Sequence, residues 1–570
     1  MMVTSANLPR SFLLSALVCL LATQPRTAAQ TVAVTPASAA NNYRVAGTVV
    51  SKTDGHPLAR ARVTLRDTKD SRKFESLVTA EDGRFDIPDV PPGKYSLTGA
   101  KRGFITAAYD QHQQFSTAIV TGAGIDTDAL LLRLAPAAVI SGKILDESGE
   151  PVRHASVTLY YQDHSNGVDQ IHQSGGAQTD DQGEYEIPSL TPGTYFLSAN
   201  AKPWYAVHPQ TDPSGSRSRR KNAPDPPENF DRSLDVAYPL TYYSDVTEAD
   251  SATPVPIQGG EHLRVDIHLN PVPSLHLLFH VPVAGNRGYA VPQLEQPAFD
   301  GSTFFQADST RVVSPGMMEI AGVPAGRYNI RVMEPGRPGV STRINGVDLT
   351  KDHEVIDTSS AEAASSVKFS VKVAGAASLP DGLAIGLRSS ARTLSGWRLV
   401  DAKGELELPQ VAAGRYEVVV WGTPQPYSVK QISAEGATVS GHSLILPVGG
   451  SATVSLTLVA GSSNVEGTAK RAGKPFAGAM VVLIPKDALK DPETNRDLYR
   501  RDQSDLDGTF SLRDVVPGSY ILLAIENGWD LDWSQPAAIA PYLSRGQAIQ
   551  VGSQVGRTIH LADAVEVQSK

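Results

Sequence analysis

The chain has 570 residues, one cysteine and a formal net charge of −9 at pH 7, from 51 basic and 60 acidic residues. This net negative charge argues against a nucleic acid partner, because phosphate binding needs an excess of clustered basic residues. The length is too great for one hydrophobic core, since domains typically span about 100–150 residues, so four or five domains are predicted.

The first 29 residues have the three parts of a secretory signal peptide. Arg10 supplies a positive start, residues 11–22 form an apolar run of twelve, and Thr27-Ala28-Ala29 offers a small-residue cleavage site. We therefore expect export to the periplasm, the cell surface or the extracellular space, with cleavage after Ala29. The apolar run is too short for a transmembrane helix, and no membrane span is predicted elsewhere. Cys19 lies in this segment, so the mature chain is expected to form no disulfide.

One segment recurs five times without a gap and organises the rest of the chain. In each copy a glycine precedes a tyrosine by twelve residues, and a second glycine stands two residues before that tyrosine. The first glycine predicts a hairpin turn, where glycine accepts a positive φ. Alternating apolar residues after it predict a short strand, and the tyrosine begins the next strand. The copies are Gly83–Tyr95, Gly183–Tyr195, Gly316–Tyr328, Gly404–Tyr416 and Gly508–Tyr520.

A further alternating block lies upstream of this segment. Upstream, three copies carry Ala61-Arg-Val-Thr-Leu65, Ala155-Ser-Val-Thr-Leu159 and Ala479-Met-Val-Val-Leu483, which have the period of half-buried strands. With about seven short strands to a copy, each unit is predicted to be a two-sheet sandwich. No segment after residue 30 shows helical periodicity, so the predicted class is all-β, with tandem immunoglobulin-like sandwiches.

The repeat spacing divides the chain into a signal peptide and five sandwiches. The third and fourth are degenerate copies, because they lack the leading glycine and the upstream block. A stretch near 208–232 in the second is rich in proline and basic residues and is predicted to be a mobile surface insertion. The predicted boundaries are 1–29 for the signal peptide and 42–135, 136–272, 273–362, 363–460 and 461–568 for the sandwiches.

The first, second and fifth units resemble the carboxypeptidase regulatory-like family. The resemblance rests on a glycine-led strand, the Pro-x-x-x-Ala-x-Val-x-Leu block, the Asp-x-x-Gly-x-Phe turn and the Pro-Gly-x-Tyr segment, and it is weak in the two middle units. It implies prealbumin-like sandwiches, related to collagen-adhesin B-type repeats and starch-binding-like folds. Family members occur as peptidase appendages, as leading domains of outer-membrane receptors and as strings in secreted bacterial proteins, which this chain is most similar to. One fold hosts many roles, so the family implies little about function.

The sequence contains no recognisable catalytic motif. A zinc carboxypeptidase needs His-x-x-Glu, and none of the thirteen histidines has a glutamate three residues later. Nucleophile-elbow, phosphate-loop and His-Glu-x-x-His motifs are also absent from the sequence. The acidic turn Asp502–Gly508 lacks the full order of a calcium loop, which favours hairpin chemistry. We therefore expect no catalytic residue, no metal ligand set and no cofactor.

Aromatic residues have two possible roles here. The five repeated tyrosines suit a structural corner, in which the hydroxyl bonds nearby backbone, better than ligand stacking. Trp397 and Trp421 lie in strand-like runs and are predicted to be core or sheet-face residues. The candidate carbohydrate-binding residues are the unrepeated aromatics in loop-like sequence, where binding residues often lie: Trp204, Tyr205, Tyr242, Tyr243, Trp529 and Trp533. The alternative role for these residues is to seal loops and domain junctions.

Two functional hypotheses follow. The first is a non-catalytic module that binds carbohydrate or another polymer of the envelope or extracellular space. The second is a structural or adhesive spacer of the bacterial cell envelope without a specific small ligand. The candidate partners are thus a polysaccharide, another envelope polymer or a protein, and an enzyme is a distant third hypothesis.

Overall fold

A computed structural model gives the fold. The predicted signal peptide and residues 210–230 of the predicted insertion lie outside the described residues. The structure describes residues 42–209, 231–281, 291–307, 309–333, 341–358, 365–376, 378–389, 394–423, 427–440, 443–460, 463–489, 498–552 and 557–570.

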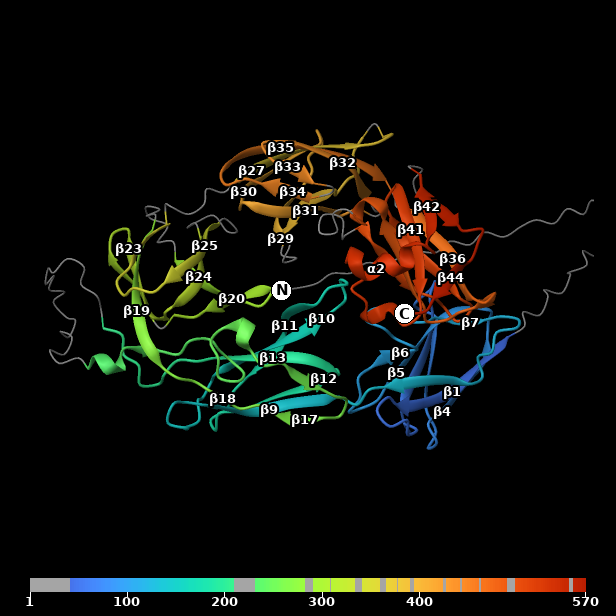
Figure 1. Ribbon diagram of the computed structural model, residues 1–570, viewed down its shortest axis with the longest axis horizontal. Helices are drawn as coiled ribbons and strands as arrows, with labels where there is room; N and C mark the ends of the chain where they lie inside the picture. Colours follow the sequence, from blue (N-terminus) through green and yellow to red (C-terminus); the bar gives the residue numbers. More distant parts are fainter. Residues whose placement is uncertain are drawn as a thin grey trace, which may run out of the picture. The chain divides into compact units, whose positions relative to one another are not determined.

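The described residues form five two-sheet sandwiches, which confirms the predicted all-β class (Figure 1). The strands of the first sandwich are β1 (Tyr43–Ser51), β2 (Arg62–Asp67), β3 (Phe74–Val78), β4 (Arg84–Val90), β5 (Gly93–Ala100), β6 (Ala107–Ala108), β7 (Ile119–Thr121) and β8 (Leu130–Leu134). One sheet has the order β4-β1-β8, and the other has the order β3-β2-β5-β6 with β7 beside β5.

The second sandwich repeats this plan. Its elements are β9 (Ala138–Leu145), β10 (Ser156–Asp163), β11 (Gln170–Gln178), β12 (Glu184–Leu190), β13 (Gly193–Asn200), the 3-10 turns η1 (Arg232–Leu234) and η2 (Ala249–Ser251), β15 (Thr241–Tyr242), β16 (Val255–Ile257), β17 (His262–Arg264) and β18 (Ile267–His268). The sheets have the orders β12-β9-β17, with β18 also beside β9, and β11-β10-β13-β15, with β16 beside β13.

The third sandwich borrows one strand from the chain segment that precedes it. Its strands are β14 (Val236–Ala237), β19 (Val272–His280), β20 (Pro292–Ala298), β21 (Gly301–Phe305), β22 (Ser309–Ser314), β23 (Met317–Pro324), β24 (Gly326–Met333), β25 (Ser341–Leu349) and β26 (Val355–Asp357). The sheets are β14-β19-β23-β22, with β26 beside β19, and β21-β20-β24-β25. β14 comes from the segment between β13 and β15, so this segment ties the second sandwich to the third.

The fourth sandwich pairs the sheet β30-β27-β35-β32 with the sheet β29-β28-β31-β34-β33. The bounds are β27 (Ser365–Val373), β28 (Ala384–Ser389), β29 (Leu394–Leu399), β30 (Glu405–Val411), β31 (Gly414–Trp421), β32 (Tyr427–Glu435), β33 (Thr438–Ser440), β34 (Ser443–Leu446) and β35 (Gly450–Ala460).

In the fifth sandwich β44 pairs with strands of both sheets and joins them in the order β37-β36-β44-β41-β38-β39. β40 and β43 also pair with β36, and β42 pairs with β41. The bounds are β36 (Ser463–Arg471), β37 (Lys474–Pro475), β38 (Met480–Pro485), β39 (Arg500–Gln503), β40 (Thr509–Val515), β41 (Gly518–Ile525), β42 (Gln547–Val551), β43 (Thr558–His560) and β44 (Val565–Gln568), with the 3-10 turns η5 (Lys486–Leu489) and η7 (Gly528–Asp530) and the helix α2 (Pro536–Leu543).

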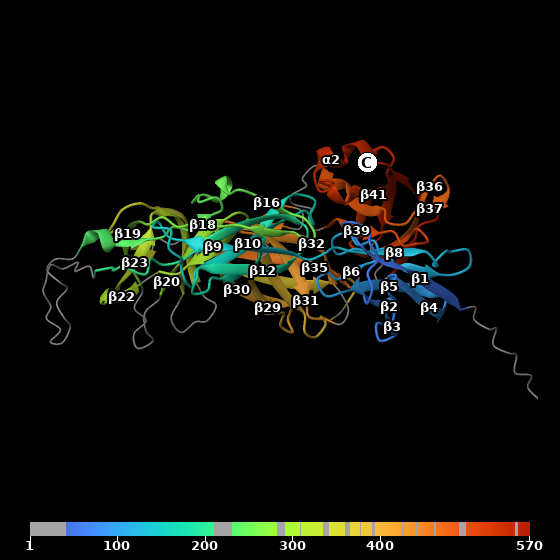
Figure 2. The ribbon, with the colours of Figure 1, turned by 90° about the horizontal axis from the view of Figure 1, so that it is seen from below.

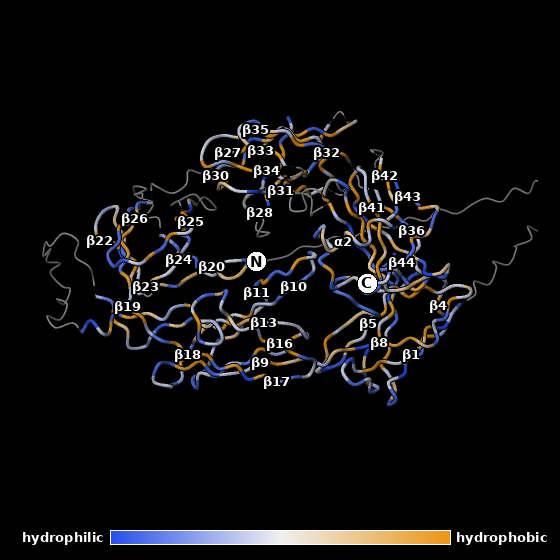
Figure 3. Tube along the Cα trace, in the orientation of Figure 1, coloured by the Kyte–Doolittle hydropathy of each residue, from blue (hydrophilic) through white to orange (hydrophobic). Residues whose placement is uncertain are grey.

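Each sandwich has its own core, built by alternation along the strands. In β8, for example, Leu130, Leu132 and Leu134 are buried, whereas Leu131 and Arg133 between them face outward. Apolar and polar residues alternate along many strands in this way (Figure 3). Because successive side chains of a strand point to opposite faces, this alternation places the apolar ones between the two sheets.

The repeated segment has the same turn and the same tyrosine contact in every copy. Its first glycine takes a φ between 71° and 85° in all five sandwiches, which confirms the predicted turns. Among the described strands, only β22 and β23 of the third sandwich pair across this turn as a hairpin. In the other four sandwiches the strands on either side of the turn pair with different partners, so the predicted hairpin is wrong there. The hydroxyl of its tyrosine donates to the backbone carbonyl four residues upstream, which confirms the structural corner. The donor and acceptor distances are 3.0 Å for Tyr95, 2.8 Å for Tyr195, 2.9 Å for Tyr328, 2.9 Å for Tyr416 and 2.6 Å for Tyr520.

The expectation that no helix follows residue 30 is wrong at α2. This helix has only eight residues, contains Pro541 and buries Ile539. So short a segment has too few turns to produce a recognisable helical period. Among the described residues, no helix combines the length and the apolar character needed to cross a membrane.

Candidate functional site

Trp529 and Trp533, two predicted carbohydrate-binding residues, are each 5% exposed. They pack against Arg501 of β39, whose guanidinium carbon lies 4.3 Å from the centre of the Trp533 ring and 6.0 Å from that of Trp529. From the first sandwich, the His112 ring stacks on Trp529 at 5.2 Å, and Phe115 lies 5.6 Å from the same ring. The two tryptophans therefore lie within a junction between sandwiches.

Polar contacts continue this junction between the first and fifth sandwiches, where β39 contacts the loop between β6 and β7 of the first (Figure 2). Lys94 Nζ donates to Asp505 Oδ2 at 2.6 Å, and Leu506 N donates to Ala118 O at 3.1 Å. Gln503 Nε2 donates to Thr117 Oγ1 at 2.8 Å. The fifth sandwich thus contacts the first, although their contacting residues are about 400 positions apart in the sequence.

The second sandwich contributes a loop to the same junction. Arg501 Nη2 donates to Ser165 O at 2.5 Å, and Ser534 Oγ donates to Gly167 O at 3.0 Å. His164 Nε2 lies 2.9 Å from Leu531 O. We call the contacts of Trp529, Trp533 and Arg501 with the first and second sandwiches the three-sandwich junction.

Burial shifts the pKa of several charged groups here, among them Arg501 and Asp502. Desolvation lowers the pKa of the Arg501 guanidinium to about 10, and it raises the pKa of the Asp502 carboxyl to about 6. Asp502 accepts hydrogen bonds from Ser511 N at 2.6 Å and from Gln503 N at 2.9 Å. Asp505 N donates to Thr509 O and Gly508 N donates to Asp505 O, so backbone hydrogen bonds close the acidic turn. The flanking strands β39 and β40 pair with other strands, so the turn is not the predicted hairpin.

The other predicted aromatics differ in exposure. Trp204 is 83% exposed and stands edge-on to Tyr205, whose hydroxyl donates to Glu147. Tyr242 is 1% exposed and packs near Phe299 of the third sandwich, with ring centres 5.4 Å apart. Tyr243 is partly buried against the core of the second sandwich. The six residues therefore do not form one surface, and their role in carbohydrate binding stays a prediction.

An exposed aromatic face lies on the fourth sandwich. Trp397 of β29 and Trp421 of β31 are 53% and 37% exposed, and their ring centres are 6.0 Å apart. Gly386 of β28 lies against the Trp421 ring, because a Cβ added there would be 2.6 Å from it. With Leu399, also exposed, these rings form what we call the Trp397–Trp421 face. Of the two predicted alternatives, core or sheet face, both tryptophans lie on the sheet face.

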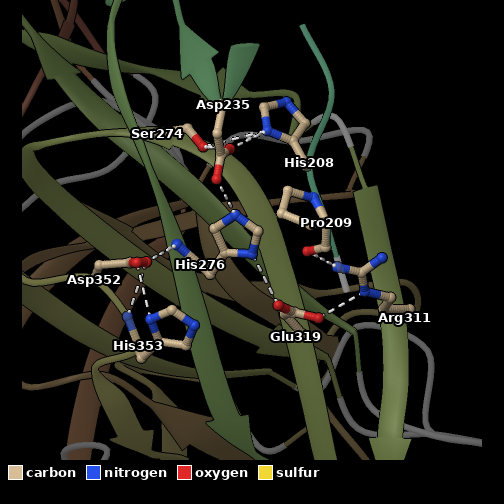
Figure 4. Close-up of polar contacts among 9 residues, drawn as sticks. All are labelled: His208, Pro209, Asp235, Ser274, His276, Arg311, Glu319, Asp352 and His353. Atoms are coloured by element: carbon tan, nitrogen blue, oxygen red, sulfur yellow. Dashed lines mark hydrogen bonds and ion pairs between the residues drawn. The ribbon is translucent and has the colours of Figure 1, made fainter. Parts of the chain in front are cut away.

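A buried polar cluster lies where the second sandwich meets the third (Figure 4). Asp235, just before β14, accepts from two imidazoles: Oδ1 is 2.8 Å from His208 Nδ1, and Oδ2 is 2.9 Å from His276 Nε2. His276 is on β19, and its Nδ1 lies 2.9 Å from Glu319 Oε1 on β23. Arg311 Nε of β22 donates to Glu319 Oε2 at 2.6 Å. We call these five residues the histidine–carboxylate cluster.

The cluster is held in place by main-chain contacts. The His276 N–H donates to Asp352 Oδ1 at 2.8 Å, and Arg311 Nη2 donates to Pro209 O at 2.7 Å. The side chains of His208, His276 and Glu319 are 5%, 3% and 0% exposed. His208 is the first residue of the predicted mobile insertion 208–232, yet its side chain is buried here.

The carboxylates set the charge of this cluster. Burial alone would lower the pKa of His276, but the hydrogen bond and charge of Glu319 and those of Asp235 outweigh it and leave the pKa raised. Burial likewise works to raise the pKa of Asp235, whereas hydrogen bonds from Ser274 and His208 and the charge of His276 bring it below its usual range. Because carboxylate oxygens only accept, both ring nitrogens of His276 carry protons in this arrangement.

Sequence reasoning missed the cluster and the partners of the tryptophans. His208, Asp235 and His276 are separated by 27 and 41 residues, which matches no metal or catalytic motif. Arg501, His112 and Phe115 also lack a local signal, because each acquires its contact from another sandwich. For Trp529 and Trp533, the only signal of a place in a junction was the general preference of large aromatics for domain junctions.

Comparison with solved structures finds likeness at low identity. The TIE protein of Bacillus anthracis is 10% identical with a TM-score of 0.17, and the match covers 75% of this chain and 75% of that chain. The minor pilin GBS52 of Streptococcus agalactiae is 14% identical with a TM-score of 0.20, covering 40% and 97%. The full-length major pilin RrgB of Streptococcus pneumoniae is 10% identical with a TM-score of 0.16, covering 92% and 99%. Scores this low are no evidence of shared function.

A comparison with curated proteins found no match. The family model described as the carboxypeptidase regulatory-like domain matches residues 44–122 and 139–213. These ranges fall on the first and second sandwiches, which carry the glycine-led strand, the glycine turn and the corner tyrosine. Over these residues, the first two sandwiches are similar to the carboxypeptidase regulatory-like domain.

Proposed function

We propose that this chain is an exported, non-catalytic structural or adhesive protein of the cell envelope, whose sandwiches are fixed to one another by side-chain junctions. The observation that carries the proposal is the three-sandwich junction. There, Trp533 packs against Arg501 and Trp529 packs against Phe115, so neither ring is open to a ligand. Large buried aromatics contribute strongly to interfaces, so such packing favours a fixed scaffold over a loosely jointed chain.

Zero-length cross-linking tests this proposal on the full chain. A carbodiimide joins an amine to a carboxylate already in contact, and Lys94 Nζ and Asp505 Oδ2 are 2.6 Å apart. We expect a peptide linking the first and fifth sandwiches through these two residues. The pair Lys143 and Glu184, 3.1 Å apart within the second sandwich, serves as the internal control. A cross-link at the control pair without one between Lys94 and Asp505 would refute a fixed junction.

A second candidate function is binding to a polysaccharide of the envelope or extracellular space. The Trp397–Trp421 face and Trp204 support it, since these are indole rings that solvent reaches. Sugar rings stack their C–H faces on such aromatic surfaces. We expect the full chain to be retained on insoluble polysaccharides, with weaker retention after Trp397→Ala or Trp204→Ala. Absence of retention across a panel of polysaccharides would remove this candidate and leave the structural role.

A further inference from the structure

The histidine–carboxylate cluster has a donor set suited to a transition metal. The donor atoms of His208, Asp235 and His276 all lie within 4.8 Å of one another. Imidazole nitrogens and a carboxylate oxygen are ligands that zinc and similar divalent ions take, whereas calcium and magnesium prefer oxygen alone. A tetrahedral zinc has bonds of about 2.0–2.2 Å, so side-chain movements of roughly an ångström bring the three donors into range.

The surroundings of His276 are those of a metal-bound imidazole. Its Nδ1 faces Glu319, and Arg311 in turn holds that carboxylate, which leaves Nε2 aimed at Asp235 (Figure 4). A carboxylate behind the imidazole fixes the ring and raises the basicity of the nitrogen that faces the metal. The backbone contact from His276 N to Asp352 fixes the strand as well.

Charge and burial favour a cation at this place. When a metal replaces the protons on the imidazole nitrogens that face Asp235, both imidazoles are neutral. The carboxylates of Asp235 and Glu319 then outnumber the guanidinium of Arg311 by one negative charge. The side chains of His208, Asp235 and His276 are 5%, 19% and 3% exposed, so water screens this charge weakly. The protons that link Asp235 to the imidazoles are the ones that a metal displaces when it binds.

We propose that His208, Asp235 and His276 bind one divalent transition metal ion of the zinc type. Three protein ligands leave a fourth position for water. Because His208 and Asp235 belong to the segment that follows β13 and His276 to β19, the ion joins the second sandwich to the third. The rival explanation is a proton-linked network that holds the same two sandwiches together without a metal.

Zinc titration of the full chain, stripped with a chelator and followed by calorimetry and elemental analysis, tests the site. We expect one zinc ion per chain, which calcium does not displace. His208→Gln is expected to lower the affinity roughly tenfold or more, since even residues that only support the ligands change affinity tenfold to a hundredfold. His262→Gln, an exposed histidine on β17, is the matched control and is expected to bind like the wild type.

A second readout protects the test against variants that fail to fold. Cobalt added to the stripped wild-type chain should give the visible absorption of a tetrahedral site with nitrogen ligands, and Asp235→Asn should weaken it. Circular dichroism checks that each variant keeps its strands. The proposal is overturned if the wild type binds less than one zinc per chain, or if folded His208→Gln and Asp235→Asn bind it with unchanged affinity.

Discussion

A tyrosine hydroxyl and a backbone carbonyl four residues upstream form a contact that all five sandwiches share. The carbonyl belongs to the last residue of the strand before the tyrosine strand, or to the residue directly after it. A buried carbonyl without a partner costs about 1–3 kcal/mol, so the hydroxyl has a specific task at this corner. The same contact persists in the two sandwiches whose sequences have drifted.

Removing one such hydroxyl should weaken its sandwich. Tyr520→Phe deletes the 2.6 Å bond to Val516 O while keeping the ring. We expect the free energy of unfolding of the fifth sandwich to fall by about 1–2 kcal/mol, measured by hydrogen exchange of its strands. Tyr542→Phe on α2, in the same sandwich, is the control and should change it little. Equal effects of the two substitutions would contradict the corner role.

Asp502 predicts a pH dependence of stability. Its pKa is raised from an ordinary value near 3.8 to about 6, so the folded state binds this proton more tightly than the unfolded state. The stabilisation is therefore complete below about pH 4 and is lost as pH rises through 6. The loss is on the order of 2–3 kcal/mol, at about 1.4 kcal/mol for each pKa unit.

Thermal unfolding of the full chain between pH 4 and 7 measures this effect. Asp502→Asn cannot ionise, so its melting temperature should fall less than that of the wild type over this range. Parallel curves for the two proteins would show that Asp502 does not carry the pH dependence. Asp507→Asn, at a carboxyl in the same turn, is the control for loss of a negative charge.

At the scale of the element, two glycines in turns of the first sandwich allow a direct comparison. Gly83 and Gly55 have nearly equal φ angles of 74° and 73°. A Cβ at Gly83 would lie 2.8 Å from Val49 O and 2.9 Å from Leu58 N, whereas one at Gly55 would have nothing within 4 Å. The left-handed backbone costs an alanine about 1–2 kcal/mol at either position. The difference in stability between the two alanine variants therefore measures the clash of the Cβ with the backbone at Gly83.

We expect Gly83→Ala to destabilise the first sandwich clearly more than Gly55→Ala. Local hydrogen exchange of β1 and β4 in the full chain measures both. If the two substitutions lower the free energy of unfolding equally, Gly83 is needed only for its positive φ and not for the close approach of the backbone.

The strands were predictable where their cause is local. Alternating apolar residues and the glycine turn decide β4 and β5, and the same residues recur in every sandwich. β14 was not predictable, because two residues acquire strand form only by pairing with β19 across a sandwich boundary. The helix α2 was not predicted either, because its eight residues are too few to show a helical period in the sequence.

At the scale of the whole molecule, the sites depend on contacts between sandwiches. The spacing of His208, Asp235 and His276 carries no signal, because separate segments bring them together. Trp529 and Trp533 were found as unusual aromatics, but the sequence could not show that Phe115 and His112 would cover Trp529. A single sequence reveals alternation within a domain, whereas docking between domains leaves no periodic trace.

Arg501 should be a key residue of the three-sandwich junction. Arg501→Ala removes its contacts with Phe115, Trp529 and Trp533, each worth about 0.5–2 kcal/mol. We expect backbone exchange in residues 110–118 and 526–534 to become roughly tenfold to thirtyfold faster.

Arg513→Ala, at an exposed arginine of β40, is the control for the loss of a positive charge. It should leave both segments unchanged. Unchanged exchange in Arg501→Ala would show that the tryptophans are held without it.

The contact of Lys94 with Asp505 has a consequence for the order in which the protein is made. A chain synthesised from its amino end contains the first sandwich long before residue 505 exists, and domains tend to fold as they emerge. During that interval Lys94, His112 and Phe115 face solvent without their partners. The first sandwich must therefore be stable while this surface is exposed. The interface is completed only when the residues of the fifth sandwich, which are synthesised last, have folded.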